Sequence, residues 1–242
     1  MRSQPAHLLQ TLPHPCGYFE GRLARNLVLD PADPALPRHY ALALRHGFRR
    51  AGGHIYRPYC GSCRACVPCR VPVREFMPDR SQRRCLRDNA DLEIIDTDPG
   101  FTRERYALYR RYLRTRHAGG GMDEAAAQDF REFLSAPWSP TRFLEFRHQG
   151  NLLAVAVTDI SPAGLSAVYT FFDPAEAHRG LGTRAILEQI EWARRLDVPH
   201  VYLGFWIAGH PKMHYKARFR PLQILEGDRW VARQADGRNQ AP

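Results

Sequence analysis

The sequence predicts an α+β fold, in which a small N-terminal unit precedes a larger domain built on a mixed, mostly antiparallel sheet. Strand-like segments at 142–147 and 152–158 flank the turn Gln149-Gly150-Asn151, and another follows at 165–172; this pattern is typical of consecutive antiparallel strands. From residue 165 to 207 the pattern then changes to strand, helix, strand. A right-handed crossover of that kind joins two parallel strands, so one parallel pair is expected in the sheet.

The N-terminal unit is expected to hold one helix, three strands and a short basic helix. Gly52-Gly53 ends the first helix, and Ser81 is the expected N-cap of the second, which spans 82–87. Apolar residues recur at helical spacing in the first helix: Leu36, Tyr40, Leu44 and Phe48. The strands are expected at 54–59, 67–73 and 92–95. We place a boundary near residue 97, which gives an N-terminal unit (1–97), a second domain (98–233) and a frayed tail (234–242).

The second domain is expected to open with two helices, 102–117 and 123–134, joined by a mobile loop at Gly119-Gly120-Gly121. The three consecutive strands follow. The crossover helix is then expected from Gly182 to Leu196, and the parallel strand at 200–207. A short helix at 212–219 and a strand at 222–225 complete the set.

Composition favours a polyanionic partner. The chain has 242 residues, 44% hydrophobic residues and a formal net charge of +10, and cations that neutralise phosphates gain free energy by releasing counterions. Segment 1–16 contains histidines and prolines where a signal peptide needs an apolar stretch, and no apolar run is long enough for a membrane span. We therefore expect no membrane partner and place the protein in the cytoplasm; the sequence gives no oligomeric state.

The two lysines of the chain are four residues apart. Among 35 basic side chains only Lys212 and Lys216 are lysines, and the other 33 are arginines. Lysine offers a compact ammonium on a flexible stem, whereas arginine offers a planar fork. The pair therefore indicates a functional site, against the alternative of a solvated helix face.

A loop between a strand and a helix has the composition of an anion-binding turn. His178-Arg179-Gly180-Leu181-Gly182-Thr183 places two glycines at the positive end of the crossover helix. The loop resembles the pyrophosphate loop of N-acetyltransferase-like (GNAT) folds, although Ala177 stands where that loop carries Arg or Gln. A packing turn would explain the two glycines equally well.

Separated blocks in one order resemble the bacterial aspartate/glutamate leucyltransferases, which are leucyl-tRNA-protein transferases related to the arginyl-tRNA-protein transferases. The blocks are Pro15-Cys16-Gly17-Tyr18, Gly47-Phe48-Arg49-Arg50, Tyr56-Arg57-Pro58, Arg80-Ser81-Gln82-Arg83-Arg84, Gly119-Gly120-Gly121-Met122, the segment 167–174, the segment 202–207 and Lys212-Met213-His214-Tyr215-Lys216. The resemblance covers nearly the full chain. It implies a GNAT-like second domain and the transfer of leucine from leucyl-tRNA to proteins that begin with Asp or Glu, which marks them for degradation by the N-end rule pathway.

The implied reaction is the aminolysis of an ester. An α-amine has a pKa of about 7.7 to 8.0, so part of it is neutral at cellular pH and no strong base is needed. Catalysis can come from positioning, from stabilising the oxyanion and from protonating the ribose oxygen. The chemistry requires no cofactor.

The resemblance also implies where the reaction takes place. In GNAT-like folds the acyl group lies where the two parallel strands separate, which predicts one wall with Tyr169, Thr170 and Phe171 and another with Tyr202, Gly204 and Trp206. Lys212 and Lys216 would act on the RNA 3′ end or on the developing charge, with Tyr215 as a proton donor. Asp173, Arg179, Gly180 and Gly182 are further expected substrate contacts.

The acidic side chain of the acceptor requires a cation, and an arginine fork can bind a carboxylate with two hydrogen bonds. Arg57, Arg83 and Arg84 lie in the matching blocks and are the candidates.

Four cysteines follow one another at intervals of three residues. Cys60, Cys63, Cys66 and Cys69 differ in spacing from a bacterial ferredoxin run, because only two residues precede the last cysteine. Cys16 with Cys60, Cys63 and Cys66 would suit a structural zinc site, and the arginyl relatives have been associated with iron-sulfur binding. A metal-free thiol cluster is an equal alternative.

Two other function classes are compatible with these observations. One is an acetyl-coenzyme A-dependent GNAT N-acetyltransferase, which Ala177 and the basic N-terminal unit disfavour. The other is a non-enzymatic, cysteine-rich RNA-binding module, which would not need the strand-loop-helix-strand pocket.

Overall fold

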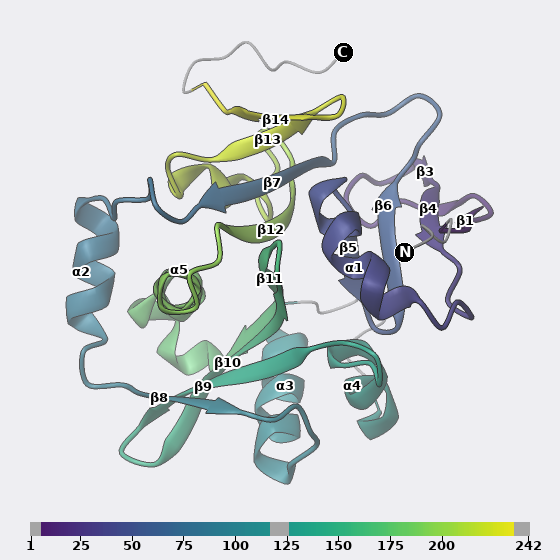
Figure 1. Ribbon diagram of the computed structural model, residues 1–242. Coiled ribbons are helices and arrows are strands. Elements are labelled where there is room, and N and C mark those ends of the chain that lie inside the picture. The colour runs from purple at the N-terminus through teal and green to yellow at the C-terminus, as the bar shows by residue number, and fades with distance from the viewer. Residues whose placement is uncertain (1–5, 117–125, 235–242) are drawn as a thin grey trace.

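An eight-stranded mixed sheet forms the centre of the molecule (Figure 1). The computed structural model describes residues 6–116 and 126–234 of the chain. Within them, the order of the strands in this sheet is β14-β13-β7-β12-β11-β10-β9-β8. Their bounds are β7 (Val67–Pro72), β8 (Glu93–Thr97), β9 (Thr141–His148), β10 (Asn151–Ser161), β11 (Gly164–Phe172), β12 (His200–Trp206), β13 (Gln223–Glu226) and β14 (Arg229–Ala232). Among the described strands of this sheet, only β11 and β12 pair in parallel, which confirms the mixed, mostly antiparallel sheet expected from the sequence.

A smaller sheet from the N-terminal part lies beside the large one, on the right in Figure 1. Its order is β1-β4-β6-β5, and β2 pairs with β3 in a separate ribbon. The bounds are β1 (Leu8–Gln10), β2 (His14–Pro15), β3 (Leu23–Ala24), β4 (Asn26–Leu29), β5 (Arg49–Ala51) and β6 (His54–Pro58). Helix α1 (Leu36–Arg45) packs with this sheet, and Tyr202 of β12 joins their apolar cluster.

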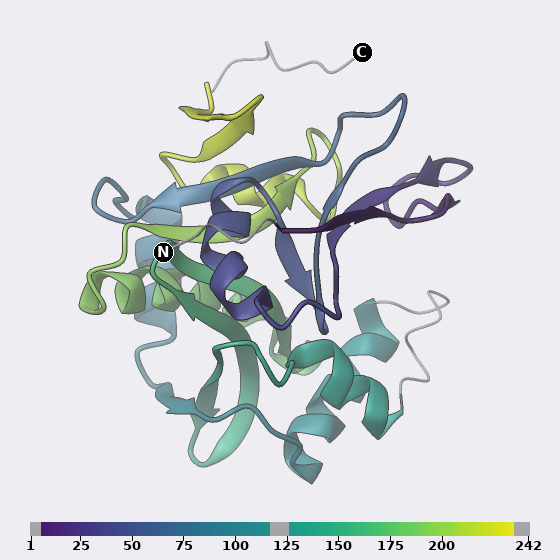
Figure 2. The same ribbon diagram turned by 45° about the vertical axis from the view of Figure 1, so that its right-hand side comes forward.

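Helices cover both faces of the large sheet. On one face, α5 (Leu181–Arg195) packs on the sheet and against α2 (Arg80–Asp88), which stands at the left edge in Figure 1. On the other face, α3 (Arg103–Arg116) and α4 (Ala127–Leu134) close a second core against β10 and β11. Figure 2 shows these two helices below the strands of the N-terminal part.

A buried ion pair joins the N-terminal part to the second core. Arg50 of β5 and Asp159 of β10 are both fully buried, and their side chains form two hydrogen bonds of 2.7 and 2.8 Å. Tyr40 Oη and Thr141 Oγ1 also donate to the Asp159 carboxylate, each at 2.6 Å. Because an unpaired buried charge is costly, this pairing fixes β5 relative to the large sheet.

Most of the expected elements are present, but three local expectations were wrong. The N-cap of α2 is Asp79, which forms a capping box with Gln82, so that helix begins before Ser81. The helix expected at 212–219 is the shorter 3-10 helix η2 (His214–Arg218). The loop after β11 contains a 3-10 helix, η1 (Pro174–Arg179), that we did not expect. The glycines expected in a mobile loop, and residues 123–125 of the second expected helix, lie outside the described residues.

The large sheet combines strands from both ends of the chain. β7 and β8 precede residue 98, yet β7 lies between β12 and β13, and β8 pairs with β9. In Figure 1, blue and yellow-green strands therefore lie side by side in the upper part of the sheet. No helix in the described part of the chain is both long enough and apolar enough to cross a membrane.

Candidate functional site

The two parallel strands separate soon after they meet. β11 and β12 pair only at Leu165 with Val201 and at Ser166 with Tyr202. Beyond these pairs, β12 stays with β7 and shifts register between Tyr202 and Gly204. Gly204 has a φ of +75°, a backbone conformation that favours glycine. A gap therefore opens between the two strands beside Gly204.

Arg49 of β5 enters this gap. Its Nη2 donates a 2.7 Å hydrogen bond to the carbonyl oxygen of Val168 on β11. On the other side, a Cβ atom at Gly204 of β12 would lie 2.8 Å from Arg49 Nη1. The guanidinium thus connects two strands that no longer pair, and the absence of a side chain at Gly204 makes room for it.

The surroundings of Arg49 are aromatic. Its guanidinium carbon lies 6.0 Å from the centre of the Phe205 ring. Four tyrosines act on it electrostatically: Tyr56, Tyr18, Tyr40 and Tyr215. The Lys216 ammonium and the Cys69 thiol are electrostatic neighbours as well. Sequence reasoning did not select Arg49, although it lies in one of the matching blocks. The isolated glycine inside the expected strand 200–207 was the available signal, because such a glycine indicates close backbone approach.

The two lysines occupy different environments. Lys216 is only 4% exposed, and its Nζ donates to the carbonyl oxygen of Phe205 at 2.5 Å and to Met213 Sδ at 3.5 Å. Burial lowers the pKa of Lys216 to about 8. Lys212 is exposed and precedes η2, so the two side chains do not share a helix face. Because η2 begins only at His214, Lys212 lies outside the helix that contains Lys216, which explains the difference.

Tyr215 lies between the gap and a neighbouring cavity. The residue as a whole is 42% exposed. Burial of its phenol raises the pKa of Tyr215 to about 12, and the nearby Cys69 and Tyr112 contribute smaller increases to this pKa. Its hydroxyl therefore carries a proton at neutral pH. Because Tyr215 also lines the cavity described next, one side chain faces both spaces.

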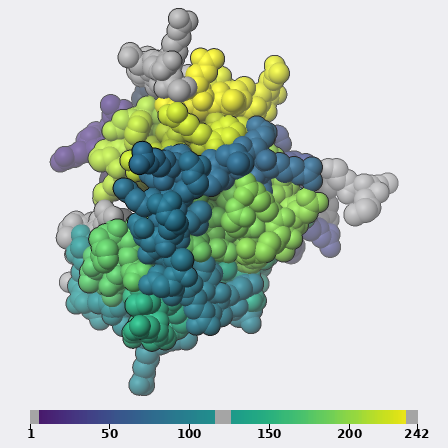
Figure 3. Space-filling model, turned by 90° about the vertical axis from the view of Figure 1, so that its left-hand side faces the viewer, coloured from purple at the N-terminus to yellow at the C-terminus, as the bar shows by residue number. Residues whose placement is uncertain are grey.

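A basic cavity of about 440 Å³ lies between α2 and the N-terminus of α5. Figure 3 looks onto this face, where the blue segment that contains α2 crosses in front of the green segments. Gly180, the N-cap of α5, has a φ of +66°, and the residue before it is Arg179. The lining residues are mostly polar and include three arginines: Ser81, Gln82, Arg84, Cys85, Asp88, His178, Arg179, Gly180, Thr183, Tyr215, Arg218 and Phe219.

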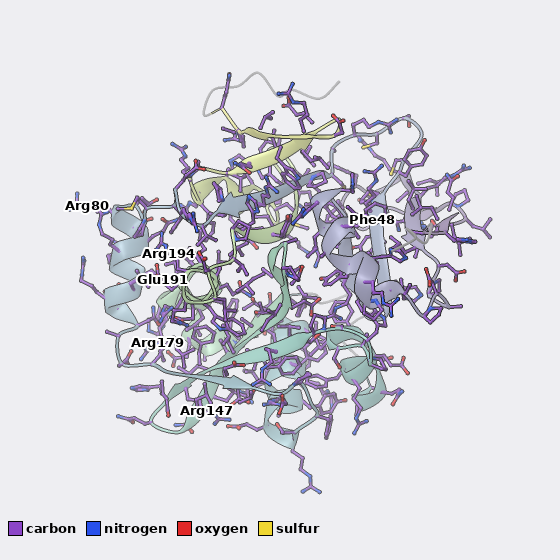
Figure 4. All side chains as sticks on the ribbon, viewed as in Figure 1. Phe48, Arg80, Arg147, Arg179, Glu191 and Arg194 are labelled. Carbon is purple, nitrogen blue, oxygen red and sulfur yellow. The ribbon has the colours of Figure 1, made fainter. Side chains whose placement is uncertain are left out.

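Three of the residues expected to contact substrate already contact other residues of the protein. Arg179 forms ion pairs with Asp91 and Glu176, and Figure 4 shows it below α5 on the side of β8. Gly182 lies in the first turn of α5, near the Phe172 ring. Asp173 caps η1 and accepts a 2.9 Å hydrogen bond from Arg111.

The three arginines proposed to bind the acceptor lie in different places. Arg84 lines the basic cavity. Arg83 is exposed and donates to the carbonyl oxygen of Pro78. Arg57 stacks on Phe48 at 5.1 Å, on the small sheet, and donates to the carbonyl oxygen of His46.

The residues expected to form each wall of the gap lie on both faces of the sheet, because side chains alternate along a strand. On β11, Tyr169 and Phe171 face the core under α3 and α4, where Phe171 is fully buried, whereas Thr170 is partly exposed. On β12, Tyr202 belongs to the cluster around α1, but Trp206 belongs to the cluster under α5. The register shift between Tyr202 and Gly204 explains why these two aromatic residues lie on opposite faces.

Two buried polar atoms near the gap have no hydrogen-bond partner among the described residues. They are Tyr169 Oη and Trp206 Nε1. Burial also raises the pKa of Tyr169 far above its usual value. Such groups are costly to leave unpaired, which is typical of sites that bind a ligand or water.

The cysteines are free thiols in the structure. Burial raises the pKa of Cys66 to about 12, and the neighbouring thiols of Cys16, Cys63 and Cys60 add to the effect. Among the described residues, no group of three or more His, Cys, Asp or Glu side chains is arranged to hold a metal ion.

Comparisons with known proteins place this chain in a family. The family model described as "Arginine-tRNA-protein transferase, N terminus" matches residues 14–84, and the one described as "Arginine-tRNA-protein transferase, C terminus" matches residues 104–226. The chain belongs to the arginine-tRNA-protein transferase family. The resemblance stated from the sequence is thereby confirmed.

Relatives within the family share about half of their residues with this chain. An aspartate/glutamate leucyltransferase of Stenotrophomonas maltophilia (strain K279a) is 57% identical over 235 residues, which cover 95% of this chain and 94% of the relative. Proteins of the same name from Xylella fastidiosa (strain 9a5c) and Pseudomonas fluorescens (strain SBW25) are 52% and 49% identical. These matches cover 92% and 91% of this chain, and 90% and 94% of the relatives.

Solved structures resemble the chain more distantly. The C-terminal domain of a putative lysylphosphatidylglycerol synthetase from Agrobacterium fabrum gives a TM-score of 0.47 at 16% identity. The structure of L-PGS from Bacillus licheniformis gives 0.46 at 11% identity. Each covers 72% of this chain, and this chain spans about half the length of each.

Proposed function

We propose that this chain transfers leucine from leucyl-tRNA to the N-terminal Asp or Glu of acceptor proteins, which creates a signal for their degradation by the N-end rule pathway. One observation carries the proposal. Relatives that bear the name aspartate/glutamate leucyltransferase are 49–57% identical to this chain over at least 91% of its length. The chain is accordingly an aminoacyltransferase, and we place its reaction in the cytoplasm, where charged tRNA is found.

The reaction exchanges an ester for an amide. The neutral α-amine of the acceptor attacks the leucyl carbonyl carbon, the bond between that carbon and the ribose oxygen breaks, and a peptide bond forms. The amine loses one proton and the ribose oxygen gains one, so the step balances without a cofactor. The protein must hold the two reactants together and supply a proton to the leaving oxygen.

The basic cavity suits the 3′ end of the tRNA. Arg84, Arg179 and Arg218 surround it, and the N-terminus of α5 adds a partial positive charge. Phosphates of the terminal nucleotides would neutralise Arg84 and Arg218, whereas Arg179 already pairs with Asp91 and Glu176. The exposed Lys212 and the exposed Arg83 lie outside the cavity and would contact the RNA backbone.

The ester would then extend past Tyr215 into the gap between β11 and β12. Tyr215 is protonated at neutral pH, since burial raises its pKa to about 12, and it faces both spaces. It is therefore the proton donor to the ribose oxygen. Thr170 lies on the β11 side of the gap, whereas the Tyr169 ring packs against Tyr112 and Phe133 under α3 and α4. The Tyr169 hydroxyl has no hydrogen-bond partner among the described residues, and it would have to turn toward the gap to donate to the oxyanion.

Lys216 holds the β12 side of the same gap. Its ammonium binds the carbonyl oxygen of Phe205, next to Gly204. We infer that it fixes this backbone and adds positive charge near the developing oxyanion. We propose that one part of the fold is GNAT-like. It consists of the parallel strands β11 and β12 and of helix α5, which lies between them in the sequence.

A donor-exchange assay tests the function. Labelled leucine on tRNA, labelled arginine on tRNA and labelled acetyl-coenzyme A are each offered with peptides that begin with Glu or Ala. Label on the Glu peptide from leucyl-tRNA alone is the expected result. Transfer only from acetyl-coenzyme A would overturn it in favour of an N-acetyltransferase, and RNA binding without any transfer would favour a binding module.

Metal content is a separate question. The proposed chemistry needs no metal, and Cys16, Cys60, Cys63 and Cys66 are the proposed ligands of a structural metal. Elemental analysis of anaerobically purified protein decides between a zinc or iron-sulfur site and free thiols.

A further inference from the structure

Arg49 is a partly buried cation without a counterion among the described residues. In the described part of the chain it forms no ion pair, and its one hydrogen bond runs from Nη2 to the carbonyl oxygen of Val168. A guanidinium has five N–H donors, so most of those of Arg49 have no partner among the described residues. The nearby groups are aromatic rings, tyrosine hydroxyls, the Cys69 thiol and the Lys216 ammonium, and none of them neutralises the charge.

Each of the three arginines that are almost fully buried in the described part of the chain has a carboxylate partner. Arg50 pairs with Asp159, Arg105 with Glu145 and Arg184 with Glu188, at nitrogen to oxygen distances of 2.7, 2.6 and 3.1 Å. A chain that neutralises these three guanidinium groups leaves Arg49 unpaired at the centre of the proposed site. A ligand that carries a negative charge would complete it.

We propose that Arg49 binds the side-chain carboxylate of the first residue of the acceptor and so determines the requirement for Asp or Glu. This inference rests on the proposed function and names the residue that selects its substrate. The bond to Val168 and the close fit against Gly204 hold the guanidinium at the gap. The carboxylate of Asp or Glu lies only two or three bonds from Cα, so the same contact would bring the attacking amine to the ester.

The tyrosines around Arg49 would strengthen the selection. Hydroxyl groups such as those of Tyr56 and Tyr18 can donate hydrogen bonds to a carboxylate. An acceptor with a neutral amide in place of the carboxylate would leave Arg49 desolvated and without its charged partner. Sites that lose a required polar contact in this way reject the analogue strongly, and we expect Gln and Asn peptides to be disfavoured about a hundredfold.

Binding without a donor is the first measurement. Isothermal titration calorimetry compares peptides that begin with Glu and with Gln on the unmodified protein, on Arg49→Gln and on Arg49→Lys, with no tRNA present. The unmodified protein should prefer the Glu peptide about a hundredfold, and Arg49→Gln should lose the preference. Arg49→Lys should keep part of it, since the charge remains but the fork is lost. Equal affinity of the unmodified protein for both peptides overturns the proposal.

Arg70→Gln is the matched control. Arg70 lies on β7, also has no carboxylate partner among the described residues, and donates to Gln223 and Tyr202 instead. Its replacement removes a comparable guanidinium away from the gap. The Glu preference should be unchanged, and a preference lost equally in Arg70→Gln and Arg49→Gln would show a nonspecific charge effect and overturn the proposal.

A chemical measurement avoids the risk that Arg49→Gln does not fold. Phenylglyoxal modifies accessible arginines, and peptide mapping by mass spectrometry follows Arg49 in the unmodified protein. The Glu peptide should slow modification of Arg49, whereas the Gln peptide should not. Equal rates with both peptides would exclude contact between Arg49 and the acidic side chain.

Transfer kinetics separate this inference from the function itself. If leucine reaches the Glu peptide and Arg49→Gln transfers to Glu and Gln peptides with the original preference, Arg49 is excluded and the function stands. If the unmodified protein binds Glu peptides through Arg49 but transfers no leucine, the assignment of Arg49 stands and the donor is wrong.

Discussion

Arg49 and Arg50 are neighbours on β5, and their environments are opposite. Arg50 is fully buried and donates to Asp159, Gly52, Leu134 and Thr141. Among the described residues, Arg49 makes one hydrogen bond, and it faces the gap between β11 and β12. Two identical residues in one strand can therefore have different roles: Arg50 fixes the strand, and we propose that the fixed strand presents Arg49 to a ligand.

The largest expected effect is on the Arg50 side of the comparison. Arg50→Gln leaves the Asp159 carboxylate buried without its cation, which should lower the free energy of unfolding by about 3–5 kcal/mol. Urea denaturation followed by circular dichroism measures it. Arg74→Gln is the control, because the Arg74–Asp197 pair is more than 80% exposed on both sides and should contribute less than about 1 kcal/mol. Similar losses in both variants would contradict the assigned role of Arg50.

A second prediction concerns Tyr215, the proposed proton donor, which lies near Arg49. Tyr215→Phe removes the hydroxyl but keeps the ring, so kcat should fall by about a hundredfold while the Glu preference set by Arg49 stays. Single-turnover transfer from leucyl-tRNA measures the rate. Tyr59→Phe, on an exposed ring, should transfer leucine at the normal rate. A loss of Glu preference in Tyr215→Phe would show that the two roles are not separate.

Lys216 is a buried cation, and keeping it charged should lower the free energy of unfolding at neutral pH. Its folded pKa of about 8 lies below the value near 10.4 of an unfolded lysine, so the unfolded chain binds more protons between these values. The stability of the unmodified protein should therefore rise with pH from about 8 to 10, with the full cost present below pH 8.

Lys216→Met removes this cost. The free energy of unfolding of the variant should be about 2 kcal/mol higher than that of the unmodified protein at pH 7. This figure includes a deduction of about 1 kcal/mol for the lost hydrogen bond to Phe205. The gain should disappear near pH 10.5, and thermal denaturation across this pH range follows it. Lys212→Met, at an exposed position, should change stability by less than about 0.5 kcal/mol at every pH. A destabilised Lys216→Met at pH 7 would refute the argument.

The smallest expected effect tests the space that Arg49 occupies. Gly204→Ala places a Cβ 2.8 Å from Arg49 Nη1, so the guanidinium must shift, and the Glu preference should fall about tenfold. Gly209→Ala is the matched control, because Gly209 has a similar backbone conformation, with a φ of +67°. Its added Cβ would have no atom within 4 Å. Both variants should lose about 1 kcal/mol of stability. Only Gly204→Ala should lose selectivity, which peptide competition assays would show.

Local patterns in the sequence predicted much of the fold. The turn at Gln149-Gly150-Asn151 and the apolar segments around it gave three consecutive strands, and the crossover rule gave the parallel pair. The position of β7 between β12 and β13 was not predicted. These strands are far apart in the sequence, and the residues around each strand do not indicate with which distant strand it pairs. β14 was missed as well, since Arg229–Ala232 is short and partly exposed.

The site was predicted less completely, for physical reasons. Tyr215 and Lys216 were selected and lie at the gap, but the burial of Lys216 depends on tertiary contacts with Phe205. The alternation expected along 202–206 was wrong, because a register shift moves Trp206 to the opposite face from Tyr202. Arg49 could not be distinguished among 33 arginines without knowing which of them have a carboxylate nearby.

The central position of β7 has a consequence for the growing polypeptide. Val71 pairs with Val201, and Cys69 pairs with both Gly204 and Ile224, so β7 is synthesised long before either neighbour exists. At ordinary elongation rates the ribosome needs on the order of ten seconds to make the missing strands. During that time an apolar strand has two unsatisfied edges, which makes the nascent chain a substrate for chaperones until its last strands emerge.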